Sequence, residues 1–335
     1  MTEKIYDFKV LAVYADYLIG ARGYKIDKYS FEGKWLEHIG TLEDTKYARM
    51  ARHKFTRRLM RAEITSFYEL RDGAMLVIAK KGFFRKEKNE HVFRKVFCVP
   101  RGSKPLNVCF SNDGMAYFGE YFQNIDKTEV HVYGSDDGCK TWRVVYTFSE
   151  GNINHIHGLF FDPYTNRIWI LTGDRENECI IGWTDDGFRS LHVELRGGQE
   201  YRSCQLFFYK EFVVYATDSQ YIENEIQAID RKTLRIKSLG KIQGSAIKGG
   251  QNGMFSYLST TVEPSKVNND RYSYIWVSCD GITWREIFKI KKDNWPSIFQ
   301  YATMEFPHYS TSIDRLFFSA RAVKMLDGKT TFAKI

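Results

Sequence analysis

Two histidines one residue apart have the spacing that most directly suggests chemistry. His155 and His157 are at positions i and i+2, and an extended strand places both imidazoles on the same side. A pair of this kind can hold a divalent metal ion or move protons in acid–base catalysis. A hydrogen-bonded structural pair is the alternative interpretation of the same spacing.

A tyrosine–arginine pair is the second candidate. Tyr201 and Arg202 lead into a strand with the apolar run 206–208, so the guanidinium is not simply part of a solvated surface. Arg202 could neutralise a carboxylate of an acidic substrate, and Tyr201 could act as an acid or a base. Both pairs depend on strands that bring them to one place.

Three similar segments indicate that these strands belong to a repeat. Residues 135–142 read SDDGCKTW, residues 184–191 read TDDGFRSL, and residues 278–284 read SCDGITW. Their spacing fits a period of roughly 47 residues, within the range of about 40–50 that is typical of propellers. A degenerate copy of the same turn falls at 229–233. Four short strands can be assigned within a unit, for example 106–111, 116–122, 129–134 and 142–148.

Repeats of this kind predict an all-β protein. Aromatic residues make up 16% of the chain, and flat rings pack well on pleated sheets. Four-stranded repeats of this length close into a β-propeller, in which only short, protected sheet edges remain. The sequence therefore predicts a single β-propeller domain over residues 1–335, with about seven blades or, alternatively, about six. The basic segment at about 43–60 is predicted to be an insertion between blades.

The turn segments resemble the Asp-box of sialidase-like (BNR repeat) β-propellers, whose pattern is Ser/Thr-x-Asp-x-Gly-x-Thr-Trp. Cys139 and Phe188 stand where the pattern has glycine, and the third copy is shorter. The resemblance implies that the aspartates cap turn amides and that the tryptophans pack between sheets. It also implies glycan-cleaving activity, which many members of this superfamily have. The N-terminal Phe/Tyr-Arg-Ile-Pro motif of exo-sialidases is absent, with Arg61 the nearest match, which disfavours sialic acid as substrate.

Propeller topology predicts where a site would lie. First strands begin and second strands end at the same mouth of the central channel, where propellers usually bind ligands. These positions carry acids, bases and tyrosines from several blades, whereas the opposite face carries ordinary turn residues. The predicted catalytic residues are Glu120, Asp174, Asp218, His155, His157 and Tyr201. The predicted substrate-binding residues are Arg61, Arg202, Gln220, Glu263 and Tyr121.

Two reactions fit these residues. A glycoside hydrolase needs two acidic groups that flank the bond, and Glu120, Asp174 and Asp218 could supply them. A polysaccharide lyase needs a cation for the substrate carboxylate and a histidine or tyrosine that moves protons. The sequence favours an enzyme that cleaves a poly- or oligosaccharide by either reaction, and the net charge of +8 favours an anionic one. The alternative is a non-catalytic propeller that binds a glycan or a protein.

Other classes of function lack their signatures. The sequence contains no GxxxxGK[ST] or GxGxxG motif, and its basic segment has few aromatic residues, which argues against nucleic-acid and nucleotide partners. No apolar run approaches the roughly 20 residues that span a bilayer. No secretory signal is evident and the six cysteines occur singly, so a cytoplasmic protein with reduced thiols is expected. No cofactor is predicted, apart from a possible metal ion at the two histidines, and the oligomeric state stays open.

Overall fold

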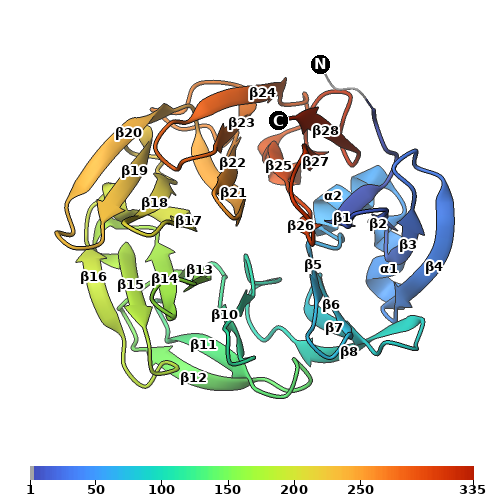
Figure 1. Cartoon of the computed structure of the whole chain (residues 1–335), viewed down its shortest axis with the longest axis horizontal. Coiled ribbons are helices and arrows are strands. Elements are labelled where there is room, and N and C mark those ends of the chain that lie inside the picture. The colour runs from blue at the N-terminus through green and yellow to red at the C-terminus, as the bar shows by residue number, and fades with distance from the viewer. Residues whose placement is uncertain (1–3) are drawn as a thin grey trace.

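A computed structural model of the chain describes residues 4–335 and shows seven blades of β-strands around a central channel, the first two joined into one continuous sheet (Figure 1). The first three blades are β1–β4 (Lys9–Val13, Leu18–Arg22, Lys25–Tyr29, Trp35–Leu42), β5–β8 (Ser66–Glu69, Met75–Ala79, Gly82–Lys86, Val92–Cys98) and β9–β12 (Cys109–Phe110, Ala116–Gly119, Val130–Ser135, Arg143–Phe148). The next three are β13–β16 (His155–Asp162, Arg167–Gly173, Ile180–Thr184, His192–Arg196), β17–β20 (Ser203–Phe208, Phe212–Thr217, Asn224–Asp230, Ile236–Ile242) and β21–β24 (Ser245–Asn252, Phe255–Thr261, Tyr272–Ser278, Arg285–Lys291). The seventh contains β25 (Thr303–Glu305), β27 (Arg315–Arg321) and β28 (Thr330–Lys334). The prediction of a seven-bladed, all-β propeller is confirmed.

The N-terminal segment closes the ring. Tyr6 pairs with Thr330 of β28, at the place where the seventh blade would otherwise have its outermost strand. The short strand β26 (His308–Tyr309) pairs with β1 in parallel. The two ends of the described chain are thereby held together, and Figure 1 shows both beside β28.

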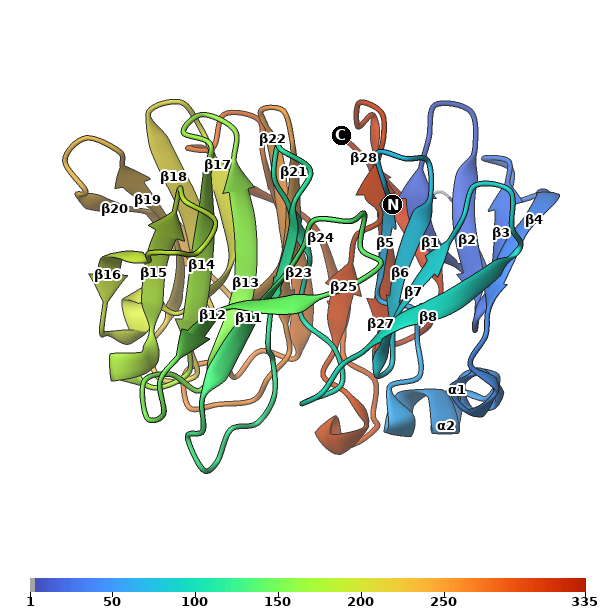
Figure 2. The ribbon, with the colours of Figure 1, turned by 90° about the horizontal axis from the view of Figure 1, so that it is seen from below.

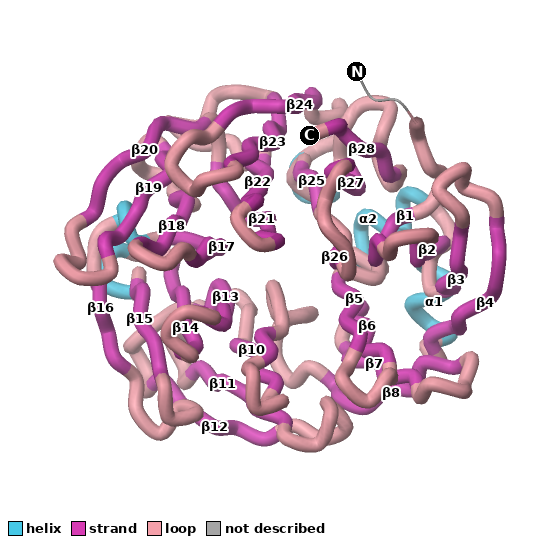
Figure 3. The backbone as a smooth tube through the Cα atoms, viewed as in Figure 1, coloured by secondary structure: helices cyan, strands magenta, loops and turns pink. Residues whose placement is uncertain are grey.

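The basic segment between the first two blades forms two short helices. These are α1 (Thr45–Ala51) and α2 (Lys54–Met60), which Figure 2 shows on one face of the ring and Figure 3 shows in cyan beside the first blade. Arg58 of α2 is fully buried and pairs with Asp293 from the connection between the sixth and seventh blades. The remaining helical segments are the 3-10 turns η1 (Glu176–Glu178), η2 (Gln199–Tyr201) and η3 (Ser297–Phe299). Within residues 4–335, no helix is long and apolar enough to cross a membrane.

Apolar clusters between neighbouring blades form the core. Between the fifth and sixth blades, for example, Phe207 and Val214 pack with Leu258 in the cluster that also includes Trp284. Each face of a sheet is covered by the next blade, so residues that point to either face are buried. The buried side chains of each inner strand are therefore held in place. This packing fixes the positions of the polar residues at the ends of the strand.

The three turns that resemble the Asp-box share one pattern of hydrogen bonds. In each turn a Ser or Thr hydroxyl donates to the aspartate two residues later, as Ser135 does to Asp137 at 2.9 Å. The same aspartate then accepts the backbone N–H of a residue further along the turn, such as that of Thr141 at 3.0 Å. Cys139 and Phe188 adopt positive φ values of 66° and 71°, and their side chains are buried between blades. Packing therefore offsets the backbone strain that glycine would avoid.

These turns predict acid sensitivity. Hydrogen bonds outweigh the opposing effect of burial and lower the pKa of Asp137, Asp186 and Asp280 from 3.8 to about 2. A depressed pKa gives stability that is complete above the unfolded value and is lost as the pH falls through the folded value. We expect the melting temperature to fall between about pH 4 and pH 2, and the triple Asp-to-Asn variant to show a flatter profile there. Identical profiles for the two proteins would contradict this role.

Candidate functional site

Strand ends from neighbouring blades bring the predicted polar residues to one mouth of the channel. His155 begins β13 and Arg202 directly precedes β17, whereas Asp174 and Asp218 directly follow β14 and β18. The other residues gathered there are Tyr121, His157, Gln220 and Glu263. We call these eight residues the mouth cluster.

The two histidines face each other across a β-bulge. The pairing of β13 with β14 skips His157, because Ile156 pairs with Thr172 and Gly158 with Leu171. Bulges of this kind redirect side chains and are frequent next to functional sites. Gly173 leaves room for the imidazole, since a Cβ there would lie 2.6 Å from Cε1 of His157.

Backbone carbonyls fix the tautomers of both rings. Nδ1 of His155 lies 2.9 Å from the carbonyl oxygen of Phe122, and Nδ1 of His157 lies 2.9 Å from that of Ser203. Because a carbonyl oxygen only accepts, each Nδ1 carries the hydrogen and each Nε2 points into the mouth. The two Nε2 atoms are 3.1 Å apart. Two bare lone pairs at this distance repel, so a proton on one Nε2 or a metal ion bound to both is needed to hold the pair.

Asp174 joins the histidines to Arg202. Its Oδ1 lies 3.4 Å from each histidine Nε2 and 3.0 Å from Nη2 of Arg202, while its Oδ2 accepts a hydrogen bond from Asn154. Burial alone would raise the pKa of Asp174, but the hydrogen bonds and charges of His155 and His157 hold it well below its usual range. Asp174 is therefore a carboxylate at neutral pH.

The His155, His157 and Asp174 side chains have a spacing that suits a divalent metal ion. Ligand atoms around a tetrahedral zinc ion with bonds of about 2.0–2.1 Å lie roughly 3.3 Å apart. The separations of 3.1, 3.4 and 3.4 Å among the two Nε2 atoms and Oδ1 match this value. His157 also forms an overlapping ligand set with Cys204 and Asp218. Arg202 contacts the same oxygen of Asp174, so its positive charge would repel a metal ion bound there.

We expect zinc to bind at this position in place of the shared proton. Calorimetric titration of EDTA-treated protein should show one zinc ion per chain, and His157→Ala should abolish the binding because it removes a ligand common to both sets. His192→Ala, which removes an exposed histidine on β16, is the matched control. If wild-type protein binds no zinc, or His157→Ala binds it equally well, a shared proton holds the pair.

Arg202 and Asp218 present unpaired atoms at the mouth. Nε of Arg202 lies 3.8 Å from Oδ2 of Asp218, which is too long for a hydrogen bond, and Oδ2 accepts one from the thiol of Cys204 instead. Nε of Arg202 and Oδ1 of Asp218 are buried without a hydrogen-bond partner among the described residues. Because unpaired buried donors and acceptors are costly, these two atoms mark a place where a polar ligand would be stabilised.

Glu263 is the carboxyl group of the mouth cluster whose pKa is raised. Burial, followed by repulsion from Asp218, raises the pKa of its carboxyl group to about 7, against the attraction of Arg202 and a hydrogen bond with Gln220. Glu263 is therefore close to half protonated at neutral pH. Next to His155, the ring of Tyr121 lies with its centroid 4.4 Å from the imidazole and covers one side of the site.

Three predicted residues lie outside the mouth cluster. Glu120 is buried in an ion pair with Arg101 and accepts a hydrogen bond from the backbone of His131. Tyr201 packs into the apolar cluster between the fourth and fifth blades. Arg61 is exposed at the C-terminal end of α2, with a φ of 51°. The structure thus gives Glu120 and Tyr201 structural partners away from the site.

Two residues that were not among the predicted site residues contact the cluster. Asn154 donates to Oδ2 of Asp174 at 2.8 Å, and Cys204 donates to Asp218 at 3.2 Å. Cys204 is two positions after Arg202, the same spacing that relates the two histidines. That shared spacing is the signal that could have identified it.

Comparison with known proteins supports the fold. No described protein family and no curated protein matches the sequence. Among solved structures, a chain of the mitotic checkpoint complex has a TM-score of 0.58 at 9% identity, covering 100% of this chain and 95% of that one. The Pan2 WD40 domain of Neurospora crassa has a TM-score of 0.53 at 8% identity, covering 100% and 90%. The GH74 enzyme of Niastella koreensis has a TM-score of 0.52 at 11% identity, covering 83% of this chain and 45% of that one.

At these identities the likeness concerns the fold alone. The chain is a β-propeller, and its structural neighbours include an enzyme as well as a chain of a multiprotein complex. Its function must therefore be argued from its own site.

Proposed function

We propose that the protein is a glycoside hydrolase that cleaves an acidic poly- or oligosaccharide at the mouth cluster. The observation that carries this proposal is a set of neighbouring carboxyl groups with separated pKa values. Burial and Asp218 raise the pKa of Glu263 to about 7, whereas His155 and His157 hold that of Asp174 far lower. Separation of this kind assigns one group as the acid and another as the ionised partner.

Each residue then has a definite role. Protonated Glu263 gives its proton to the leaving glycosidic oxygen, and a carboxylate of Asp218 or Asp174 attacks the sugar or activates water. The unpaired Nε of Arg202 binds an acidic group of the substrate, and the ring of Tyr121 supports a sugar ring. Gln220 orients Glu263 through its hydrogen bond.

The contacts support a hydrolase better than a lyase. Either enzyme could use Arg202 for an acidic group of the substrate, so the difference between them lies in the base. A lyase would use a tyrosine or histidine as the base. Burial raises the pKa of Tyr121, so its phenol stays protonated at neutral pH and is not available as a base, and Tyr201 packs away from the cluster.

A non-catalytic binding propeller is the second candidate. It is favoured by two ion pairs at the same end of the ring, Glu120 with Arg101 and Glu178 with Lys127. In each pair the acidic and the basic side chain neutralise each other. In such a protein the mouth would bind a glycan or a protein partner without turnover.

A screen against acidic and neutral polysaccharides tests the proposal. New reducing ends and ultraviolet absorbance from unsaturated products are measured in parallel, with and without EDTA. Reducing ends without the absorbance are expected for the hydrolase. Both signals together would indicate a lyase, and a glycan that binds without either signal would indicate the binding propeller.

A further inference from the structure

Three segments that are far apart in the sequence adjoin one another on the mouth side of the ring. They are helix α2, the connection 294–300 that contains η3, and the β27–β28 turn at 322–329. Helix α2 and η3 each lead into an innermost strand, and the turn follows a second strand, so all three lie at the end where the mouth cluster lies. Figure 2 shows α1, α2 and the orange turn of η3 projecting beyond the strands. We call α1, α2 and the two adjoining segments the α2 face.

Ring contacts and ion pairs hold the segments of the α2 face together. The ring centroid of Phe55 lies 5.6 Å from that of Phe299. Nζ of Lys54 lies 3.2 Å from Oδ2 of Asp327, and Nε of Arg58 donates to the carbonyl oxygen of Phe299 at 3.3 Å. The side chains that these segments expose are therefore carried on one packed unit.

Four large apolar side chains project from the α2 face. Phe55 and Leu59 lie one turn apart on α2 and are 52% and 46% exposed. Ile298 of η3 is 77% exposed, and Met325 of the β27–β28 turn is 88% exposed. Single exposed apolar residues are ordinary on a protein surface, but a group of them on adjoining segments indicates a site of contact.

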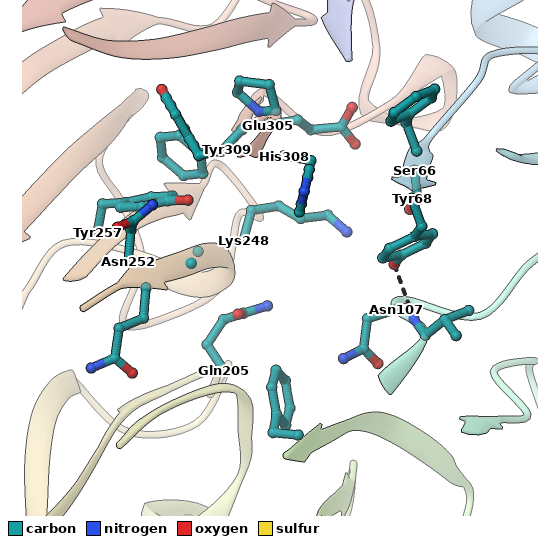
Figure 4. A pocket seen from close by; sticks show the side chains of 18 of the residues that line it. Ser66, Tyr68, Asn107, Gln205, Lys248, Asn252, Tyr257, Glu305, His308 and Tyr309 are labelled. Carbon is teal, nitrogen blue, oxygen red and sulfur yellow. Dashed lines mark hydrogen bonds between the residues drawn. The ribbon is translucent and has the colours of Figure 1, made fainter. Parts of the chain in front are cut away.

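The shape of this surface indicates what kind of partner it suits. At the opposite end of the channel, apolar and polar side chains line a cavity of about 640 Å³, among them Tyr257, Tyr309 and Lys248 (Figure 4). A cavity of that kind encloses a small ligand. The apolar side chains of the α2 face instead project from helices and turns, so they lose contact with water only in a partner that surrounds them.

The charges that the described residues of the α2 face expose are positive. Residues 46–61 include seven Lys or Arg and no acidic residue. Arg49, Arg52 and Arg61 are exposed, and none of them forms an ion pair with a described residue. The carboxylate of Asp327, in the β27–β28 turn, is buried beneath Lys54 and Arg57. The partner that complements this face is therefore anionic as well as apolar.

We propose that the α2 face docks on the surface of an anionic lipid bilayer. Apolar side chains on a basic surface insert at the boundary between headgroups and acyl chains, and the basic side chains are attracted to anionic headgroups. A fluid bilayer surrounds projecting side chains without needing a matching contour. This docking goes beyond the cleavage proposed above and does not depend on it. Because the mouth cluster lies at the same end of the ring, a docked protein would hold that cluster towards the bilayer.

Co-sedimentation of the full chain with vesicles tests the proposal. The probes are vesicles of phosphatidylcholine alone and vesicles in which one third of the lipid is phosphatidylserine, each at low and high salt. We expect binding to the anionic vesicles at low salt, weaker binding at high salt and little binding to phosphatidylcholine alone. Failure to bind the anionic vesicles at low salt would overturn the proposal, and so would equal binding to both kinds of vesicle.

Two double variants separate the electrostatic from the apolar contribution. Arg49→Gln/Arg52→Gln should weaken binding to the anionic vesicles by about 25-fold, or about fivefold for each basic residue near the membrane surface. Ile298→Ser/Met325→Ser should weaken it by roughly tenfold or more, because two large apolar side chains no longer enter the bilayer. All four side chains are exposed, so both variants should keep the wild-type melting temperature.

Matched double variants on the opposite face are the controls. Lys140→Gln/Arg189→Gln removes two exposed basic side chains from the β11–β12 and β15–β16 turns. Met254→Ser/Ile282→Ser removes an exposed methionine and an exposed isoleucine from the β21–β22 and β23–β24 turns. Both controls should bind vesicles as the wild type does.

A soluble polyanion distinguishes a bilayer from another acidic partner. Heparin is titrated into the wild type and into the two variants of the α2 face. Undiminished vesicle binding by Ile298→Ser/Met325→Ser would overturn the proposal, because the apolar side chains would then not enter the bilayer. If heparin binding is also lost in Arg49→Gln/Arg52→Gln alone, the α2 face binds a soluble polyanion through its arginines instead.

Discussion

Glu263→Gln should reduce turnover of the cleaved polysaccharide by about 10²–10⁴-fold, the usual contribution of a general acid. The amide keeps the size of the side chain and its hydrogen-bonding contact with Gln220, but it has no proton to give to the leaving oxygen. Binding of the substrate should change by only a few-fold, because the substitution affects the transition state more than the ground state. Initial rates over a range of substrate concentrations measure the two effects separately.

The pH profile gives an independent measure of the same role. Glu263 acts in its protonated form and its pKa is about 7, so wild-type kcat/KM should fall as the pH rises above that value. The residual activity of Glu263→Gln should lack this decline. Glu223→Gln, in the exposed β18–β19 connection, is the control and should keep both rate and profile. Full activity in Glu263→Gln would remove Glu263 from the reaction and assign the proton transfer to another residue of the mouth cluster.

The blade architecture could be predicted because turns and strands recur along the chain. The strands predicted at 129–134 and 142–148 begin and end within one residue of β11 and β12. The parallel pairing of β4 with β8, which joins the first two blades, depends on a contact between distant segments. No local pattern reports such a contact. The sequence also indicated the basic insertion without indicating that Arg58 would be buried against Asp293.

The sequence placed the candidate residues correctly along the axis but did not resolve the direction of their side chains. Topology correctly brought His155, Asp174 and Arg202 to one mouth. At a strand end, however, neighbouring side chains point to opposite sides. Glu120 therefore faces Arg101 while Tyr121 faces His155, and Tyr201 packs between blades while Arg202 enters the cluster. A difference of one residue, which the sequence does not resolve, decides whether a polar residue reaches the site.

Arg231→Met should lower the free energy of unfolding by about 3–5 kcal/mol, the cost of leaving one partner of a buried ion pair uncompensated. Arg231 lies in the degenerate copy of the turn repeat, and its guanidinium contacts both oxygens of Asp162 at 2.6 and 3.1 Å. Asp162 is completely buried and belongs to the preceding blade. The degenerate turn has Ala228 where its relatives have the Ser or Thr before the aspartate, keeps the hydrogen bonds from Thr233 to Asp230, and in addition connects two blades.

Urea denaturation of Arg231→Met, of the neighbouring exposed Lys232→Met and of the double variant Asp162→Asn/Arg231→Met measures this effect. Lys232→Met should stay within about 0.5 kcal/mol of wild type, as surface substitutions usually do. The double variant should recover part of the loss, because an amide is far less costly to bury than an unpaired carboxylate. Asp162 also accepts hydrogen bonds from Thr165 and Trp169, which would serve the amide oxygen equally well. If Arg231→Met is as stable as Lys232→Met, these local bonds alone hold the carboxylate and the blades are joined by their apolar clusters.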